Sequence, residues 1–314
     1  MVLKYLSLSI EIIVLVLNYI FTSIKAIYKS LTFKEKSVAG EIVLITGAGH
    51  GIGREMSIQY AALGAIVICW DINEAMNHET VNIIKSNGGN ATGYTVDITN
   101  RDKVLEVGQK VLSDVGTVTI LVNNAGIMPH NELLKHTEGQ IRKTFETNIL
   151  AHFWMLEAFL PKMIEDNYGH IVAVSSINGL LPIKYLVPYC STKFAVRGLM
   201  ECLFEELRLN SNGKSKIKGT TVFPYMVKTG LFQQAKVRFP RLMPLLDPKE
   251  TAASIISAQR RELEEASVPR SFFHIVRFFR IFPNAANILV TEFLDSAPIL
   301  NKNGKEEAFA EVSK

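Results

Sequence analysis

Short, almost entirely apolar runs recur along the middle of the chain, and each is followed by a longer segment that mixes apolar and polar residues. The runs cover residues 41–45, 65–70, 91–96, 119–122 and 171–174. Strands that are apolar on both faces are typical of a parallel sheet with helices on each side. The segments between the runs have helical periodicity, at residues 54–63, 73–87, 100–114 and 137–163. This alternation predicts a doubly wound α/β domain.

Composition bounds the size and class of this domain. The chain has 314 residues, of which 48% are hydrophobic and 20% charged, with a formal net charge of +4. That is enough for one domain of about 250 residues with extensions. There is no dense Lys/Arg tract and no nucleic-acid motif, so nucleic acid is not an expected partner. Three separated cysteines, Cys69, Cys190 and Cys202, form no C-x-x-C pair. They argue against zinc or a disulfide framework and favour a reducing compartment.

Residues 1–36 form a hydrophobic arm with one polar line. The segment 6–24 is mostly apolar and approaches the length of a membrane span, whereas Lys4, Glu11, Asn18 and Lys25 recur every seventh residue. Such a helix either spans a bilayer or lies in the interface with its polar line in water. A secretory signal peptide is the alternative, but no convincing small-x-small cleavage site follows. We therefore expect a membrane anchor, and the lysines after it predict that the following domain faces the cytosol.

A glycine-rich turn follows the first apolar run. It reads Thr46-Gly47-Ala48-Gly49-His50-Gly51-Ile52-Gly53 and leads into a helical segment. Glycines permit a tight turn and a close approach of the backbone to a phosphate, and a helix opening near Ile52 points free N–H groups there. Between a buried strand and a helix, this turn is strong evidence for a nucleotide phosphate site.

Two carboxylates follow the next two strands. Asp71 comes eighteen residues after Gly53, where it would accept hydrogen bonds from both ribose hydroxyls of an adenosine and repel a 2′-phosphate. It favours NAD over its phosphorylated relative, although His50 and Arg54 near the turn weaken that preference. Asp97 is placed to meet the adenine edge. Asp71 could also cap the helix that follows it, since the two roles do not exclude each other, and Asp97 could equally cap the helix from Asn100.

Tyr189 and Lys193 are the most reactive pair in the sequence. They stand four residues apart after Pro188, which suits the first turn of a helix, so they share a helical face. An ammonium beside a phenol favours the phenolate and lowers the tyrosine pKa from about 10. The pair therefore predicts a general base near neutral pH.

Two further polar residues need an explanation. Asn148 interrupts the apolar part of the helix 137–163, where it either satisfies local backbone or binds a water in a proton path. Ser176 follows the strand 171–174, at the edge where open parallel sheets bind their ligands.

Taken together, these motifs resemble the short-chain dehydrogenase/reductase superfamily over residues 40–229. The resemblance rests on Thr46-Gly47-x-x-x-Gly51-x-Gly53, Asn123-Asn124-Ala125-Gly126, Asn148, Ser176 and Tyr189-x-x-x-Lys193, in that order. Finer details, including Trp70-Asp71-Ile72-Asn73 and the N-terminal arm, resemble a membrane-associated branch. That branch contains 17-beta-hydroxysteroid dehydrogenases type 11 and 13 and epidermal retinol dehydrogenases. It implies a Rossmann-type fold and action on lipophilic alcohols at the endoplasmic reticulum or lipid droplets.

The resemblance also implies a role for each matched residue. Tyr189 takes the alcohol proton as hydride leaves for nicotinamide, Lys193 lowers its pKa and holds the nicotinamide ribose, and Ser176 hydrogen-bonds the substrate oxygen. Asn148 holds a water that links Lys193 to solvent. Cys190 is interpreted as packing. The residues expected to contact NAD are Gly47, Gly49, His50, Gly51, Ile52, Gly53, Asp71, Asp97, Asn124, Ala125, Gly126, Tyr189, Lys193, Val227 and Thr229.

The sequence departs from the superfamily at Tyr225, within Phe223-Pro224-Tyr225-Met226-Val227, where Pro-Gly is usual. This leaves the contacts of that loop open. Beyond Thr229 we expect a substrate lid within residues 230–285, a helix over 251–265 and a polar tail over 301–314. The segment 270–282 has apolar residues on one side and basic residues on the other. It is either a helix packed on the domain or a basic helix at a membrane interface.

The whole pattern predicts an arm over 1–36 and one dehydrogenase domain over 37–300. We expect NAD-dependent interconversion of a lipophilic alcohol (a steroid, a retinol or a long-chain alcohol) with its ketone or aldehyde. The alternative is a lipid-droplet surface protein with little turnover. The superfamily commonly pairs through two long helices, here 137–163 and 188–209, so a homodimer is expected.

Overall fold

The computed structural model describes residues 2–32, 34–229, 235–236, 238–239, 245–294 and 297–298. By internal contacts the chain separates into two compact units, Met1–Lys36 and Ser37–Lys314, which are described separately. The expected polar tail at 301–314 lies outside the described residues, as does most of the lid segment 230–246.

The larger unit is built on a seven-stranded parallel sheet with the order β3-β2-β1-β4-β5-β6-β8. The chain builds outward from β1 to β3 and then crosses to β4 on the other side of β1. The carboxyl ends of the two central strands, β1 and β4, therefore flank the switch point where such sheets bind ligands. This confirms the predicted doubly wound α/β class. The strands are β1 (Ile42–Thr46), β2 (Ile66–Asp71), β3 (Asn90–Thr95), β4 (Ile120–Asn123), β5 (His170–Val174), β6 (Lys218–Pro224) and β8 (Glu265–Val268).

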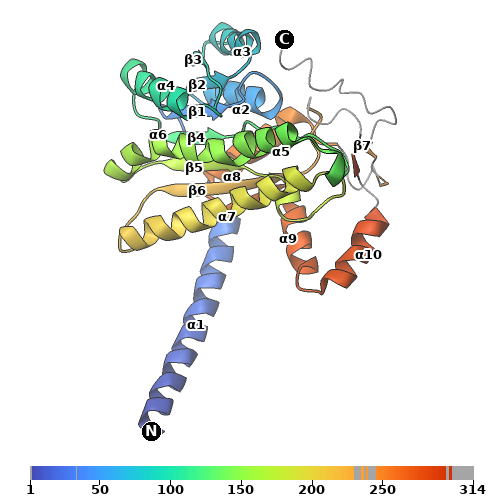
Figure 1. The fold of residues 1–314 in the computed structure, drawn as a ribbon. Coiled ribbons are helices and arrows are strands. Elements are labelled where there is room, and N and C mark those ends of the chain that lie inside the picture. Colours follow the sequence, from blue (N-terminus) through green and yellow to red (C-terminus); the bar gives the residue numbers. More distant parts are fainter. Residues whose placement is uncertain are drawn as a thin grey trace. The chain divides into compact units, whose positions relative to one another are not determined.

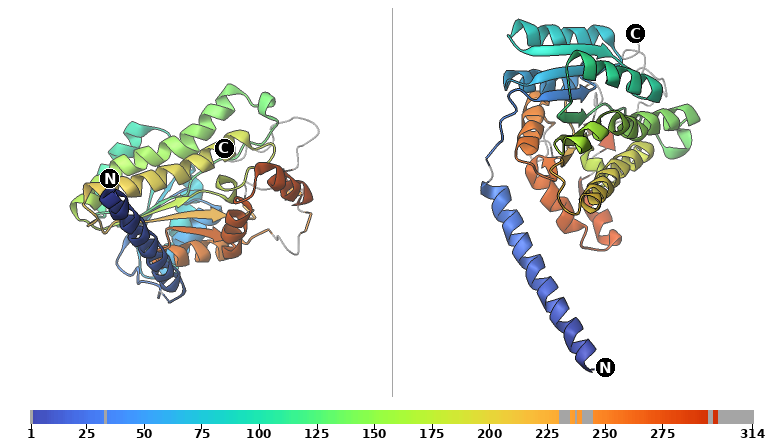
Figure 2. Two further views of the ribbon diagram at one scale, coloured as in Figure 1. Left: turned by 90° about the horizontal axis from the view of Figure 1, so that it is seen from below. Right: turned by 90° about the vertical axis from the view of Figure 1, so that its left-hand side faces the viewer.

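Helices cover both faces of the sheet (Figures 1 and 2). One apolar core joins the sheet to α2 (Gly51–Ala62), α3 (Glu74–Ser86) and α8 (Pro248–Arg260). The opposite core joins it to α4 (Arg101–Asp114), α6 (Ala151–Glu165) and α7 (Val187–Asn210). Alternate residues of the central strands enter opposite cores, so β1, β2, β4 and β5 are mostly apolar, whereas the edge strands β3 and β8 carry more polar residues.

The predicted helix over 137–163 is divided in the structure. It consists of α5 (Glu138–Phe145), a π-helical turn η2 (Glu146–Leu150) and α6, and Asn148 lies in the π turn. A π turn inserted into a helix frequently marks a functional site. The interruption expected at Asn148 is therefore a real change of helical geometry.

Two strands of the seven-stranded sheet, β6 and β8, were not predicted. The expected helix over 251–265 ends at Arg260, and residues 265–268 instead form the edge strand β8, which pairs with β6. The strand begins at Glu265, which has an acidic, helix-like sequence around it, and its carboxylate is used in ion pairs with Arg197 and Arg277. Tertiary contacts thus override the local helical pattern.

The C-terminal part of the unit adds α9 (Arg270–Phe279) and α10 (Asn284–Leu294). Phe273 and Val276 of α9 are buried in a small third core with Phe223 of β6 and with residues that follow β5 and β6, among them Ile177 and Tyr225. The same helix exposes Ile275 and Phe278, and the exposed apolar surface continues through Ile281, Phe282, Ile288, Leu289 and Phe293. The first interpretation, a helix packed on the domain, is confirmed, and the second, a basic helix at a membrane interface, stays a prediction. The remaining short elements are η1 (Leu133–Lys135), η3 (Ile177–Gly179), β7 (Ala235–Lys236) and β9 (Ala297–Pro298).

The smaller unit is a single helix, α1 (Val2–Thr32). Its segment Leu8–Lys25 is long and apolar enough to cross a membrane, and none of that segment is buried. Eighteen residues rise about 27 Å along a helix, close to the thickness of a bilayer core.

Candidate functional site

The glycine turn after β1 has no room for side chains. Gly47 and Gly51 have positive φ angles of 69° and 56°. A Cβ at Gly53 would lie 1.9 Å from the carbonyl oxygen of Gly47, so the turn closes directly on the first residues of α2. His50 stands at the N-cap of α2 with no capping side-chain bond, and Ile52 packs on the adjoining core. The turn and the helix start fit the diphosphate of a dinucleotide.

The segment after β4 is hydrogen-bonded to Thr46, at the start of the glycine turn. The hydroxyl oxygen of Thr46 accepts hydrogen bonds from the backbone N–H groups of Asn124 and Ala125, at 3.0 and 3.1 Å. The Asn124 side chain donates to the carbonyl of Thr46 at 2.9 Å. Asn124 and Ala125, predicted as cofactor contacts, are thus also what holds the glycine turn in shape.

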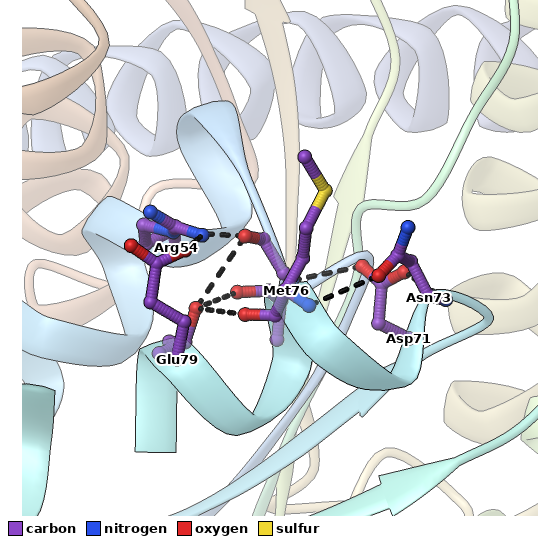
Figure 3. Close-up of polar contacts among 8 residues, drawn as sticks. Arg54, Asp71, Asn73, Met76 and Glu79 are labelled. Atoms are coloured by element: carbon purple, nitrogen blue, oxygen red, sulfur yellow. Dashed lines mark hydrogen bonds and ion pairs between the residues drawn. The ribbon is translucent and has the colours of Figure 1, made fainter. Parts of the chain in front are cut away.

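Asp71 is buried at the end of β2, and both its oxygens accept backbone hydrogen bonds (Figure 3). Gly49 N–H donates to Oδ2 and Asn73 N–H donates to Oδ1, each at 2.8 Å. The alternative role as cap of α3 is wrong, because Asn73 is the N-cap and accepts from Met76 N–H. Each carboxylate oxygen can accept more than one hydrogen bond, so the carboxylate fits a ribose diol.

The other predicted nucleotide contacts lie around this centre. Asp97 is exposed after β3, and it bonds Thr99 rather than capping α4, whose N-cap is Asn100. The side chain of Thr229 lies against Gly51, because a Cβ at Gly51 would be 3.1 Å from Thr229 Cγ2. Val227 is buried and bridges to Leu246.

Arg54, the basic residue near the glycine turn that would favour a phosphorylated cofactor, forms contacts with two other residues of the protein. Its Nε donates to the carbonyl of Gly49 at 2.8 Å, and its Nη2 forms an ion pair with Glu79 of α3 at 2.6 Å (Figure 3). The guanidinium therefore faces α3 and the glycine turn.

The predicted catalytic residues converge at the carboxyl end of β5. Tyr189 and Lys193 lie on the first turns of α7, and both are buried. Lys193 Nζ donates to the carbonyl of Val174 at 2.9 Å and lies 5.6 Å from the centre of the Tyr189 ring. Ser176, two residues beyond Val174, forms a side-chain hydrogen bond with Tyr189.

The expected effect of Lys193 on Tyr189 is wrong for the protein alone. Burial raises the pKa of Tyr189 to about 12, and the hydrogen bond with Ser176 offsets only part of that rise. Burial likewise lowers the pKa of Lys193 to about 8. Desolvation is the largest cause of both pKa shifts, because burial removes water from the charged form of each group.

The side chain of Asn148 satisfies backbone, although not the local backbone of its own helix that the first alternative named, and its role in binding a water stays a prediction. Its Oδ1 accepts from Ile127 N–H and its Nδ2 donates to the Ile127 carbonyl, both at 2.8 Å. Nδ2 also lies 3.2 Å from Thr192 Oγ1. Gly126 passes between this amide and Lys193, since a Cβ there would be 3.2 Å from Asn148 Oδ1 and 3.5 Å from Lys193 Nζ. The amide fixes the loop after β4 beside the lysine.

His152 belongs to this cluster and was missed in the sequence. It is one helical turn beyond Asn148, it is buried, and its Nδ1 has no hydrogen-bond partner. Burial, with the charge of Lys193 as a smaller cause, lowers its pKa to about 3. A polar residue four positions after Asn148 in the same apolar run was the available signal.

An apolar hollow adjoins Ser176. It is lined by Ser176, Ile177, Asn178, Ile183, Leu186, Tyr225 and Met226. Tyr225 packs edge-on against Phe272 of α9, with ring centres 5.1 Å apart, so the departure from Pro-Gly forms part of this wall. Cys190 is buried beside Tyr189 and Leu186, in agreement with a packing role. Among the described residues, no three His, Cys, Asp or Glu side chains gather as a metal site.

Comparisons with known proteins agree with this geometry. A family model described as short chain dehydrogenase matches residues 41–238. The chain is 44% identical to short-chain dehydrogenase/reductase family 16C member 6 of Bos taurus, with 81% of this chain and 79% of the relative covered. It is 37% identical to epidermal retinol dehydrogenase 2 of Mus musculus, over 92% and 95% of the two chains. It is 38% identical to 17-beta-hydroxysteroid dehydrogenase 13 of Homo sapiens, over 91% and 94%.

Among solved structures, a short chain dehydrogenase/reductase from Burkholderia phymatum in complex with NAD matches with a TM-score of 0.70 and 23% identity. The match covers 84% of this chain and 98% of that one. It supports the fold. The resemblance drawn from the motifs, to the superfamily and to its membrane-associated branch, is confirmed by the sequence relatives.

Proposed function

The chain belongs to the short-chain dehydrogenase family, and we propose that it oxidises a lipophilic alcohol with NAD, or reduces the matching carbonyl. The observation that carries this proposal is the meeting of Ser176, Tyr189 and Lys193 at the carboxyl end of β5, between a glycine turn and an apolar hollow. A dinucleotide in the turn and a hydrophobic substrate in the hollow would both reach these three side chains.

In the proposed reaction, Ser176 donates a hydrogen bond to the substrate oxygen and Tyr189 accepts the hydroxyl proton. Lys193, held by the Val174 carbonyl, keeps a positive charge beside the phenol ring. Oxidised NAD, when bound, would supply the hydride acceptor and a second positive charge, which together with that of Lys193 would favour the phenolate of Tyr189. Asn148 and Thr192 keep the loop after β4 and the start of α7 in register with each other.

The preference for NAD is assigned to Asp71. Its carboxylate is fixed by two backbone N–H groups and is buried, so a 2′-phosphate placed there would meet a negative charge with little solvent screening. His50 contributes no bond to the helix cap and stays available to the nucleotide.

The substrate class is inferred from the hollow beside Ser176. Its lining is mainly apolar, with Ile177, Ile183, Leu186 and Met226 around the polar centre. Two relatives carry retinol and 17-beta-hydroxysteroid in their names. The apolar lining suits an apolar alcohol, but the hollow has a volume of about 10 Å³, room for about one water molecule. A bulky alcohol would therefore need the lining side chains to move apart, and its size is proposed from the names of the relatives alone.

Membrane association is proposed from two apolar surfaces, each taken by itself. The helix α1 carries a span-length apolar segment. The helices α9 and α10 expose Ile275, Phe278, Ile281 and other apolar side chains, with the basic residues Arg277 and Arg280 among them. We propose attachment to the endoplasmic reticulum or a lipid droplet, with the catalytic domain in the cytosol. These surfaces also favour the second candidate function, a droplet surface protein with little turnover.

A homodimer is proposed through α5, α6 and α7. These helices expose Phe145, Phe153 and Val187, which a partner copy would bury. Light scattering in mild detergent tests this proposal, and a monomer would contradict it.

The function is tested with purified protein, NAD or NADP, and a panel of steroids, retinols and long-chain alcohols. We expect reduction of NAD with at least one of them. If no alcohol is oxidised by protein that binds NAD, the droplet-surface role is the better description.

A further inference from the structure

Arg54 connects the glycine turn to the third helix of the fold. It stands in the first turn of α2 and reaches back, so that its Nε donates to the carbonyl of Gly49 at 2.8 Å. Its Nη2 is held by Glu79 of α3 at 2.6 Å (Figure 3). The N–H of the same glycine donates to Asp71 Oδ2 at 2.8 Å. Gly49 is thus bound on its carbonyl side by Arg54 and on its amide side by Asp71.

We propose that Glu79 and Arg54 are positioning residues for nucleotide discrimination: they fix Gly49, and Gly49 fixes the carboxylate of Asp71. This inference rests on the proposed use of Asp71 to select NAD. Arg54 and Glu79 do not need to touch the nucleotide themselves.

The packing at Gly49 shows why a small displacement there matters. A Cβ at this residue would lie 2.9 Å from Asp71 Oδ2 and 3.0 Å from Met76 Cβ. The carboxylate and the start of α3 therefore rest directly on the glycine. Because the donor N–H and the packing surface belong to one residue, a shift of Gly49 changes both the hydrogen bond and the position of the carboxylate.

Another side chain holds the neighbouring residue but not Gly49 itself. The hydroxyl of Thr80 lies 3.0 Å from the Ala48 carbonyl and 3.5 Å from the Gly49 carbonyl. A hydroxyl donates one proton, and the Met76 carbonyl at 3.1 Å competes for it, so the 3.5 Å contact with Gly49 is the weakest of the three. Ala48 is also held by its own N–H, which donates to the Trp70 carbonyl at 3.1 Å. Loss of Arg54 would therefore leave Ala48 anchored and release Gly49, which makes the effect local to the Asp71 contact.

Stability alone does not account for the ion pair. The Glu79 side chain is 58% exposed, and the Arg54 side chain is 21% exposed. Exposed pairs contribute about 0–1 kcal/mol to stability. The distinctive feature is that Arg54 donates its Nε–H to the carbonyl of Gly49, the residue whose N–H contacts the carboxylate of Asp71.

The test measures Kd for NAD and NADP by calorimetry on the full chain, without substrate. The variants are Glu79→Gln, Arg54→Gln and the double variant, with Asp71→Ala as positive control. The matched control is Glu157→Gln, which breaks the Arg101 pair between α4 and α6 on the other face of the sheet. We expect each single variant to lower the preference for NAD about tenfold, the scale of one lost hydrogen bond to a charged group. The double variant should lose no more than Arg54→Gln alone.

The other outcomes are distinguishable. An unchanged preference in folded Glu79→Gln and Arg54→Gln, with a lowered one in Asp71→Ala, overturns this inference alone. A further loss from Glu79→Gln in the Arg54→Gln background also overturns it, because Glu79 would then act through its own charge. A gain in NADP affinity confined to Glu79→Gln overturns it too, since released Arg54 would be a phosphate ligand. No effect of Asp71→Ala overturns the proposed cofactor selection itself.

Discussion

The ammonium of Lys193 lies 5.6 Å from the centre of the Tyr189 ring, but its hydrogen bond goes to the carbonyl of Val174 at 2.9 Å. The lysine is therefore fixed to the end of β5 whether or not the phenol is ionised. Its influence on Tyr189 is electrostatic, through the ring face, and not a direct proton exchange. The base and its cationic neighbour can thus be altered separately.

Tyr189→Phe should reduce turnover at least about 100-fold, because the proton acceptor is lost while the ring packing remains. Binding of NAD should change little. Tyr168→Phe is the control, since this exposed phenol bonds Glu41 away from the site. Steady-state rates and NAD titrations on both variants check the assignment. More than a few per cent of wild-type activity in Tyr189→Phe would show that another group is the base.

His152 should make the protein sensitive to mild acid. Burial lowers its pKa from 6.5 to about 3, so below pH 6.5 the unfolded chain binds a proton that the folded chain does not. Stability is then lost as pH falls, by about 2 kcal/mol at pH 5 from this group. We expect urea unfolding at pH 7 and pH 5 to show a smaller loss in His152→Gln. The exposed His78→Gln is the control. Equal losses in His152→Gln and the wild type would contradict this account.

Two glycines give a matched test of the turn. Gly53→Ala would place a methyl group 1.9 Å from the Gly47 carbonyl, whereas Gly198→Ala in α7 meets nothing within 4 Å. The first should abolish NAD binding or folding. The second should raise the unfolding free energy by up to about 1 kcal/mol, the difference in helix propensity. Thermal unfolding and NAD titration distinguish the two. If the Gly53→Ala variant binds NAD normally, the glycine turn is not part of the NAD site.

The sequence was most informative where local pattern and tertiary role coincide. Four of the five predicted strands are almost wholly buried, the exception being β3, and each of the five lies within one or two residues of its expected bounds. The catalytic spacing was also readable, because Tyr189 and Lys193 depend only on helical periodicity. Strand β8 was not readable, because Glu265 is stabilised in the sheet by arginines from α7 and α9.

Electrostatics were the least predictable part of the site. Spacing placed Lys193 beside Tyr189 correctly, but the extent of burial, which decides both pKa values, depends on the whole fold. Similarly, Arg54 looked like a possible phosphate ligand until Glu79, twenty-five residues away, was found against it.

The exposed surface of α9 and α10 gives a membrane prediction. Phe278→Glu and Ile281→Glu in the full chain should weaken binding to anionic lipid vesicles, because each places a carboxylate on an apolar, basic surface. Leu112→Glu, on exposed α4, is the control. Vesicle flotation measures the effect. If Phe278→Glu, Ile281→Glu and Leu112→Glu all float equally well, the exposed surface of α9 and α10 does not contribute to membrane binding.

The last prediction concerns how α1 sits in a membrane. Glu11 lies within the span-length segment Leu8–Lys25, and a charged residue at mid-bilayer costs about 2.5–3.5 kcal/mol on insertion scales. A lone spanning helix would carry Glu11 into or near that zone. A helix lying in one leaflet keeps its polar line in water, and a lipid droplet offers only one leaflet over oil.

We therefore expect residues 1–30 to carry a fluorescent protein to lipid droplets. Glu11→Leu should shift the fusion towards bilayer membranes, because a full span then becomes less costly. Tyr19→Leu, which changes an exposed residue of the same segment without altering its charge, is the matched control. A glycosylation acceptor placed before Met1 gives the direct measurement. Its modification in the wild type would place the N-terminus in the lumen, and the helix would then span the bilayer.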